Sequence, residues 1–226
     1  MPINKDRILF EDPHFLAVHK LSGELVVKGK GEVGKLPLLD FLKKEFPGLR
    51  PVSRLDFETS GVVLFARTKQ AMEASLAALK AADKDEKKAW SKVYRTLVMG
   101  RLEKKEGDLR FPLPSRMGTG NVPAHTHYKI LELFGNSTYV EALITTGRHH
   151  QIRKHFSKIG HALVLDKLYG NAKYNRVFTL EFGYRRFFLH AYALSFPHPI
   201  TGEQIHVEAP LPLPFVQALK RLRELL

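Results

Sequence analysis

The chain contains no cysteine, and this absence removes several classes of chemistry. Without thiols the protein forms no disulfide, holds no iron–sulfur cluster or cysteine-containing zinc site, and uses no thiolate nucleophile. Long apolar runs are also absent, since no stretch approaches the roughly 20 residues that span a bilayer. The first ten residues, MPINKDRILF, lack an apolar core of signal-peptide length. We therefore expect a soluble, cytoplasmic protein with no membrane partner.

Acidic residues are few relative to basic ones. The 36 Lys and Arg outnumber the 23 Asp and Glu, which gives a net charge of +13. Such an excess concentrates polyanions at the protein surface and favours a nucleic acid or an acidic membrane as partner. Charge alone is equally compatible with a role in solubility, so the partner must be argued from the motifs.

Apolar patterning predicts the secondary structure. Strands are predicted over Phe15–His19, Leu25–Val27, Gly61–Ala66, Lys92–Val98, Thr126–Phe134, Thr138–Thr145, Leu189–Phe196 and Gln204–Glu208. Helices are predicted over Leu38–Phe46, Lys69–Ala82, Gln151–Ile159 and Pro214–Leu226. Because strands and helices do not alternate regularly, the pattern favours an α+β fold, a largely antiparallel mixed sheet flanked by a few helices. We expect one domain over residues 1–226.

Two turn-rich segments complete this outline. Gly135–Ser137 separates two predicted strands and indicates a hairpin. Gly107–Ala124 is rich in glycine and proline and carries two arginines. We expect it to be a long surface loop of the kind that can close over a bound ligand.

A polar string precedes the most apolar predicted strand. Ser53–Gly61 reads SRLDFETSG and leads directly into Val62–Ala66. A carboxylate such as Asp56 at this junction can lie at the mouth of a cleft, on a loop held by a rigid scaffold. By composition alone the string is better explained as a capped turn, in which Asp56 and Thr59 bind local backbone amides.

A second polar segment, Gly147–His155, reads GRHHQIRKH and enters a predicted helix. Arg153 lies about 100° of helical rotation from Ile152, on the flank of the apolar stripe. From there its guanidinium can reach a partly buried carboxylate. His150 and His155 are five residues apart and no HExxH pattern occurs, so a metal site is not expected. A solvated basic helix is the alternative.

The predicted strand Lys92–Val98 carries an aromatic ring beside basic residues. Lys92 and Tyr94 fall on the same face, where the ring can stack on a nucleobase. A tyrosine in a strand is also a common packing residue. A further string, Gly29–Gly34, matches GxGxxG, but no apolar second strand ends at an acidic residue after it. We therefore expect no dinucleotide.

Together these segments resemble the RluA-type pseudouridine synthases. Arg54–Asp56 with Thr59–Ala66 is similar to that family's HRLDxxTSGLLLFA signature, and Gly147–His155 is similar to its GRTHQIRxH motif. Lys92–Gly100 resembles the KxYxAxVxG strand, and Asp166–Gly170 follows at the family's spacing. The segments occur in the family's order across nearly the whole chain.

The resemblance implies a pseudouridine synthase fold with a central basic active-site cleft. It implies isomerisation of specific uridines in tRNA or rRNA, without metal or cofactor. By the matched positions, Asp56 is the essential carboxylate acting on a flipped uridine, Tyr94 packs against the uracil and accepts the proton from C5, and Arg153 pairs with the carboxylate. Arg54 matches the residue that fills the gap left in the RNA. The expected RNA contacts are Arg54, Lys92, Arg116, Arg148, His150 and Lys154.

The chain departs from the family pattern at Ser53, His149 and Leu21, where the family usually has His, Thr and Pro. These changes leave the acid, base and stacking residues in place, so we expect a change of target uridine rather than loss of activity. We also expect no N-terminal S4 RNA-binding module, and a monomer. The main alternatives are a non-catalytic RNA-binding or RNA-chaperone module, and a nucleoside hydrolase that would release free uracil.

Overall fold

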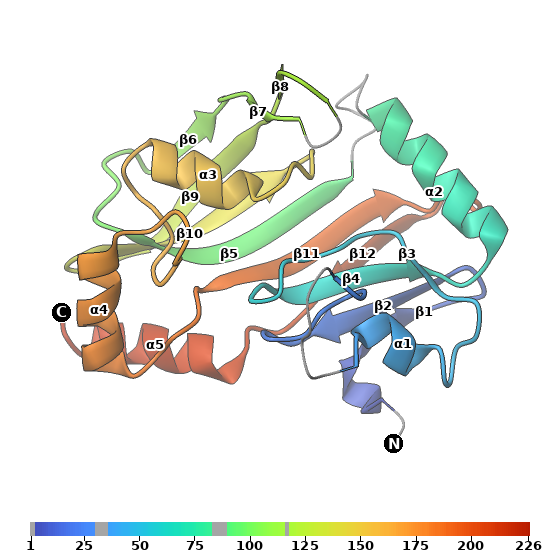
Figure 1. Cartoon of the computed structure of the whole chain (residues 1–226), viewed down its shortest axis with the longest axis horizontal. Helices are drawn as coiled ribbons and strands as arrows, with labels where there is room; N and C mark the ends of the chain where they lie inside the picture. Colours follow the sequence, from blue (N-terminus) through green and yellow to red (C-terminus); the bar gives the residue numbers. More distant parts are fainter. Residues whose placement is uncertain (1–2, 30–35, 83–89, 116–117) are drawn as a thin grey trace. The chain divides into compact units, whose positions relative to one another are not determined.

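A computed structural model describes residues 3–29, 36–82, 90–115 and 118–226 of the chain (Figure 1). The contacts between residues divide the chain into two compact units. The first comprises Met1–Ser91 and Ala191–Pro210, and the second comprises Lys92–His190 and Leu211–Leu226. Each unit therefore consists of two separate segments of chain. The expectation of one catalytic domain over residues 1–226 stays a prediction.

The first unit is built on antiparallel strands. Its elements are the 3-10 helix η1 (Lys5–Arg7), β1 (Ile8–Glu11), β2 (Phe15–Lys20), α1 (Leu38–Leu42), β3 (Arg50–Pro51), β4 (Ser60–Ala66), α2 (Lys69–Ala82), most of β11 (Leu189–Pro197) and β12 (Gln204–Glu208). The strand order is β1-β2-β4-β11, with β12 beside β11 and β3 beside β4. Every residue of β2 and β4 is buried, because apolar side chains cover both faces of these strands.

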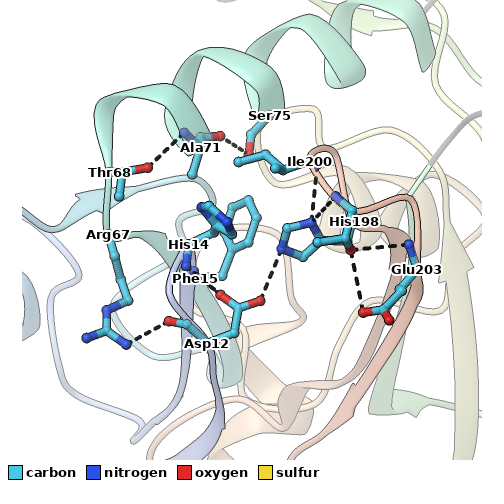
Figure 2. A network of polar contacts seen from close by, with 11 residues as sticks. Asp12, His14, Phe15, Arg67, Thr68, Ala71, Ser75, His198, Ile200 and Glu203 are labelled. Carbon is cyan, nitrogen blue, oxygen red and sulfur yellow. Dashed lines mark hydrogen bonds and ion pairs between the residues drawn. The ribbon is translucent and has the colours of Figure 1, made fainter.

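A buried polar network joins two turns of the first unit (Figure 2). One carboxylate oxygen of Asp12 accepts the amides of His14 and Phe15, and the other lies 3.1 Å from Nε2 of His198. Nδ1 of His198 accepts two backbone amides, of Ile200 and Thr201, so Nε2 carries the proton that is donated to Asp12. The network thus fixes the turn after β1 to the turn after β11.

The second unit is a twisted antiparallel sheet covered by helices. Its elements are β5 (Ser91–Met99), β6 (Glu106–Leu109), β7 (Leu113–Pro114), β8 (Asn121–Val122), β9 (Thr126–Leu133), β10 (Ser137–Ile144), α3 (Gln151–Lys158), α4 (Ala172–Phe182) and α5 (Leu213–Arg223). The sheet order is β5-β10-β9-β6, and β7 pairs with β8 in a separate hairpin. Phe156 of α3, Phe178 of α4 and Phe215 of α5 join one core with the sheet.

Much of the predicted secondary structure is confirmed. The fold is α+β with largely antiparallel strands, α2 has the predicted bounds, and the Gly135–Ser137 hairpin joins β9 to β10. Leu25–Val27 is not a strand. Instead, the carbonyls of Leu25 and Val26 accept the amides of Leu38 and Leu39 at the start of α1. These bonds satisfy helix amides that would otherwise lack partners.

Helix α4 was missed, and the loop Gly107–Ala124 is more ordered than expected. The side chain of Asn171 caps α4 and Gly183, at φ 78°, ends it. The expected loop contains the end of β6 and the paired strands β7 and β8. In the described part of the chain, no helix has the length and apolar character needed to cross a bilayer.

Candidate active site

Asp56 lies in the loop between β3 and β4 of the first unit, and its side chain is half-buried. A turn closes beside it, since the Asp56 carbonyl accepts the Thr59 amide at 3.2 Å. The fully buried ammonium of Lys20 donates to the carbonyls of Leu21, Phe57 and Thr59. These bonds tie the loop that carries Asp56 to the end of β2, so the carboxylate sits on a fixed backbone.

The polar string Ser53–Gly61 ends in glycine because of the backbone conformation and close packing at this position. The φ of Gly61 is +117°, which side-chain-bearing residues rarely adopt. A Cβ atom at this position would lie 2.2 Å from the carbonyl oxygen of Ala191 in β11. The close approach of these two strands therefore requires a residue without a side chain, five positions after Asp56.

Lys92 and Tyr94 lie on β5 of the second unit, opposite Ile144 and Ala142 of β10. Tyr94 is half-buried and packs against the apolar core of this unit. Two residues further along, the buried Thr96 donates its hydroxyl to the carbonyl of Phe188. Tyr94 therefore stands next to a strand position that is anchored by a buried hydrogen bond.

Arg153 on α3 is 7% exposed and forms a bidentate ion pair with the fully buried Asp166. The guanidinium Nε and Nη2 lie 2.6 and 2.9 Å from the two carboxylate oxygens. The rings of Tyr169 and Phe187 stand over the guanidinium carbon, with centroids at 5.0 and 4.7 Å. Contacts of this kind attract a cation through the ring quadrupole. Within this unit the carboxylate that Arg153 contacts is that of Asp166, and the expected pairing of Arg153 with Asp56 stays a prediction.

Asp166 is held as an anion. Its carboxylate also accepts the backbone amides of Leu168 and Tyr169, at 2.9 and 3.1 Å. Burial by itself raises the pKa of Asp166, but the hydrogen bonds from Arg153 and from the amide of Tyr169 outweigh it, so the pKa lies below its ordinary value. A buried pair is costly unless its polar atoms are satisfied, and the two amides meet that condition.

The residues before α3 form a tight turn. His150 adopts a left-handed conformation, with φ 54°, and its ring stacks on that of His149 at 3.7 Å between centroids. Nδ1 of His150 lies 3.0 Å from the hydroxyl of Tyr169. Arg148 donates from Nε to the carbonyl of Pro123 at 3.3 Å. Lys154 is half-buried on the first turn of α3.

The structure thus groups most of the predicted site residues in the second unit. They are Lys92, Tyr94, Arg148, His150, Arg153 and Lys154. Asp56 and the exposed Arg54 belong to the first unit, and the convergence of Asp56 with Tyr94 and Arg153 stays a prediction. Arg116 lies outside the described residues, as does most of the GxGxxG string.

No metal centre is visible in the part of the chain that the structure describes, where no three His, Asp or Glu side chains are grouped as ligands. The prediction of a reaction without metal or cofactor stays a prediction.

Sequence reasoning missed three buried polar residues of the second unit. Asp166, Gln151 and His155 stand in the matched motifs, but nothing in their spacing identified the contacts they make.

Comparisons with known proteins agree with the fold and with the motifs described above. A family model described as RNA pseudouridylate synthase matches residues 14–158. A Vibrio cholerae protein named ribosomal large subunit pseudouridine synthase C is 33% identical over 225 residues, which cover 96% of this chain and 69% of the relative. Its namesake in Escherichia coli K12 is 35% identical over 230 residues, covering 96% and 70%.

The fold is also found among solved structures. The human protein titled RNA Pseudouridylate Synthase Domain Containing 4 superposes with a TM-score of 0.79 at 24% identity, over 97% of this chain and 94% of that one. The human Domain Containing 1 protein gives a TM-score of 0.69, also at 24% identity, over 96% and 94%. The family match spans the Asp56 loop, β5 and α3. This chain therefore belongs to the RNA pseudouridylate synthase family and is an isomerase, a pseudouridine synthase.

Proposed function

We propose that the chain converts uridine to pseudouridine in the RNA of the large ribosomal subunit. The names of the relatives from Vibrio cholerae and Escherichia coli support this RNA, because they match 96% of the chain at 33% and 35% identity. The departures at Ser53 and His149 lie within the two motifs that resemble the catalytic signatures. We therefore propose a target uridine of its own within that RNA.

Asp56, Tyr94 and Arg153 are the proposed catalytic residues. The environment of Arg153 is the observation that carries this assignment, since a guanidinium is buried between two rings and fixed by a carboxylate. A guanidinium has five N–H donors, so it can serve Asp166 and a second carboxylate together. In this proposal Asp56 is that second carboxylate, and Arg153 orients it by hydrogen bonding.

The reaction balances within one nucleotide. The bond from N1 of uracil to the ribose C1′ breaks and a bond from C5 to C1′ forms. A proton leaves C5, with Tyr94 as the proposed acceptor, and N1 gains a proton. No oxidant or reductant is consumed, because the product is an isomer of the substrate.

The nucleotide must first leave the RNA stack, at a cost on the order of a few kcal/mol. Phosphate contacts offset this cost without reading the base sequence. The net charge of +13 supports such contacts, and the proposed residues are Arg54, Lys92, Arg116, Arg148, His150 and Lys154. Tyr94 supplies a flat wall for the extruded uracil. We further propose that the protein acts as a monomer. We also propose that it acts in the cytoplasm, where its RNA is found.

Pseudouridine mapping of total RNA tests the proposal. Cells that lack the gene should lose pseudouridine at one or a few positions of large-subunit ribosomal RNA. The wild-type gene should restore the modification and an Asp56→Asn gene should not. Loss confined to tRNA would overturn the proposed RNA, and restoration by the Asp56→Asn gene would overturn the assignment of Asp56.

A further inference from the structure

The side chain of Gln151, at the first position of α3, uses its whole hydrogen-bonding capacity although it is only 3% exposed. Its Oε1 accepts the hydroxyl of Thr146 at 2.7 Å and the amide of Arg148 at 3.1 Å. Its Nε2 donates to the carbonyl of His125 at 2.8 Å and to the hydroxyl of Thr126 at 3.3 Å. One amide therefore joins the loop before α3 to the start of β9.

His155, one turn later on α3, makes a second set of contacts with the same region. Its Nε2 lies 2.9 Å from the carbonyl of Phe111, which can only accept, so Nε2 carries a proton. Its Nδ1 lies 2.9 Å from the hydroxyl of Thr126. With the ring neutral, Nδ1 accepts the hydroxyl proton, and the oxygen of Thr126 remains able to accept Gln151.

The two residues hold both ends of one segment. Phe111 lies two residues before the start of the β7–β8 hairpin, and His125 and Thr126 follow the hairpin. Between these ends the hairpin is closed by pairing of Leu113 with Val122 and by the Ser115 amide on the carbonyl of Gly120. Arg148 adds a contact from its Nε to Pro123.

We propose that Gln151 and His155 are positioning residues that clamp the base of the β7–β8 hairpin to α3, so that the hairpin and Arg148 together present one RNA-binding surface. This inference rests on the proposed function, because the clamp acts on the binding of RNA. Neither residue has a role in bond making, so loss of the clamp weakens RNA binding and leaves the chemical step largely intact.

Protonation of His155 weakens the clamp. A protonated ring would donate from both nitrogens, and the hydroxyl proton of Thr126 would lose its acceptor. Burial lowers the pKa of His155 and outweighs the hydrogen bond to the Phe111 carbonyl, which raises it. The titratable side chains that act on the ring are His125 and Lys158, and a positive charge on either would lower the pKa further. The ring is therefore neutral at pH 7, the form in which Nδ1 accepts the Thr126 hydroxyl.

Steady-state kinetics on an RNA fragment that contains the mapped uridine test the clamp. Gln151→Met and His155→Phe should each raise KM about tenfold, equivalent to the loss of one or two hydrogen bonds. Both should leave kcat within about threefold. His155→Gln, which restores one donor and one acceptor, should recover most of the loss. His206→Phe, at an exposed histidine of β12, is the matched control and should not change KM.

The pH profile separates positioning from mere stability. The KM of the wild-type protein should rise as the pH falls below 6.5, and His155→Gln should flatten this rise. Unchanged KM in both folded clamp variants would overturn the inference, as would an equal fall in kcat. Absence of pseudouridine with wild-type protein would instead overturn the proposed function.

A measurement on the wild-type protein covers the case in which the variants do not fold. Nitrogen-15 shifts of the imidazoles should show His155 neutral with its proton on Nε2 at pH 7. Amide exchange at hairpin residues 113–115 and 118–122 should accelerate as His155 titrates. A protonated ring at pH 7 would overturn the inference. An amide exchange rate that does not change as His155 titrates would also overturn it.

Discussion

Arg153 and Asp166 bind each other through two hydrogen bonds, at 2.6 and 2.9 Å, in the interior of the second unit. The backbone amides of Leu168 and Tyr169 complete the shell around the carboxylate. This bidentate geometry fixes the position and the orientation of the guanidinium. Arg153 is therefore an oriented cation, and Asp166 is the residue that orients it.

Asp166→Asn should lower both stability and turnover. The change leaves the buried guanidinium without its counter-charge, which typically costs about 3–5 kcal/mol. Urea denaturation followed by circular dichroism measures the loss of stability, and steady-state assays measure kcat. The exposed pair of Arg223 with Glu132 provides a control, since Glu132→Gln should cost less than about 1 kcal/mol. Equal small losses in the two variants would show that the Asp166 pair does not orient Arg153.

Gly61→Ala should destabilise the first unit by on the order of 4 kcal/mol or prevent its folding. The new Cβ would meet the Ala191 backbone at 2.2 Å, and neither strand can move without losing buried contacts. Gly135→Ala is the matched control, because nothing lies within 4 Å of its Cβ position. Thermal melts compare the two, and a similar melting temperature for both variants would contradict the account.

The network of Asp12 and His198 should also be sensitive to substitution. His198→Phe leaves the carboxylate of Asp12 and the amides of Ile200 and Thr201 without their partner. We expect a loss of about 2–4 kcal/mol in the free energy of unfolding. His206→Phe, on the exposed side of β12, should change it by less than about 0.5 kcal/mol. An equally mild effect at both positions would show that the network adds little stability.

The free energy of unfolding should fall as the pH drops below about 6.5. The pKa values of His19 and His155 are lowered, chiefly by burial, so the unfolded chain binds protons before the folded one does. Each histidine contributes a slope of at most about 1.4 kcal/mol per pH unit. Asp166 acts in a separate window, because its pKa lies below 3.8 and its contribution is lost only in stronger acid. Urea titrations between pH 5 and 8 test this, and a flat profile would contradict it.

Much of the fold could be predicted from local pattern, and the exceptions have physical reasons. Lys69–Ala82 has a cap at Thr68 and one apolar stripe, and both signals in the sequence predict the helix. Leu25–Val27 has strand-like composition, but long-range bonds to the start of α1 decide its conformation. Helix α4 had its own signals, since Asn171 and Gly183 bracket it and Tyr174, Phe178 and Phe182 are spaced by four.

In the candidate site, too, contacts between residues that are distant in the chain could not be predicted from local pattern. The motif strings point to Asp56, Tyr94 and Arg153 as candidates, because their positions match the family's signatures. The strings do not reveal that Asp166 binds Arg153, because 13 residues and a turn separate them in the chain. The contacts of Gln151 and His155 with Thr126 span 25 and 29 positions and likewise depend on the tertiary fold.

The most direct test of the central claim is a comparison of Asp56→Asn with wild-type protein on the same RNA fragment. Pseudouridine formation should fall by at least about 10³-fold, because the substitution removes the charge and the acid–base function. The dissociation constant for the RNA should stay within about threefold, because the amide side chain has nearly the same shape as the carboxylate that it replaces. Pseudouridine formation at an appreciable fraction of the wild-type rate would contradict the account.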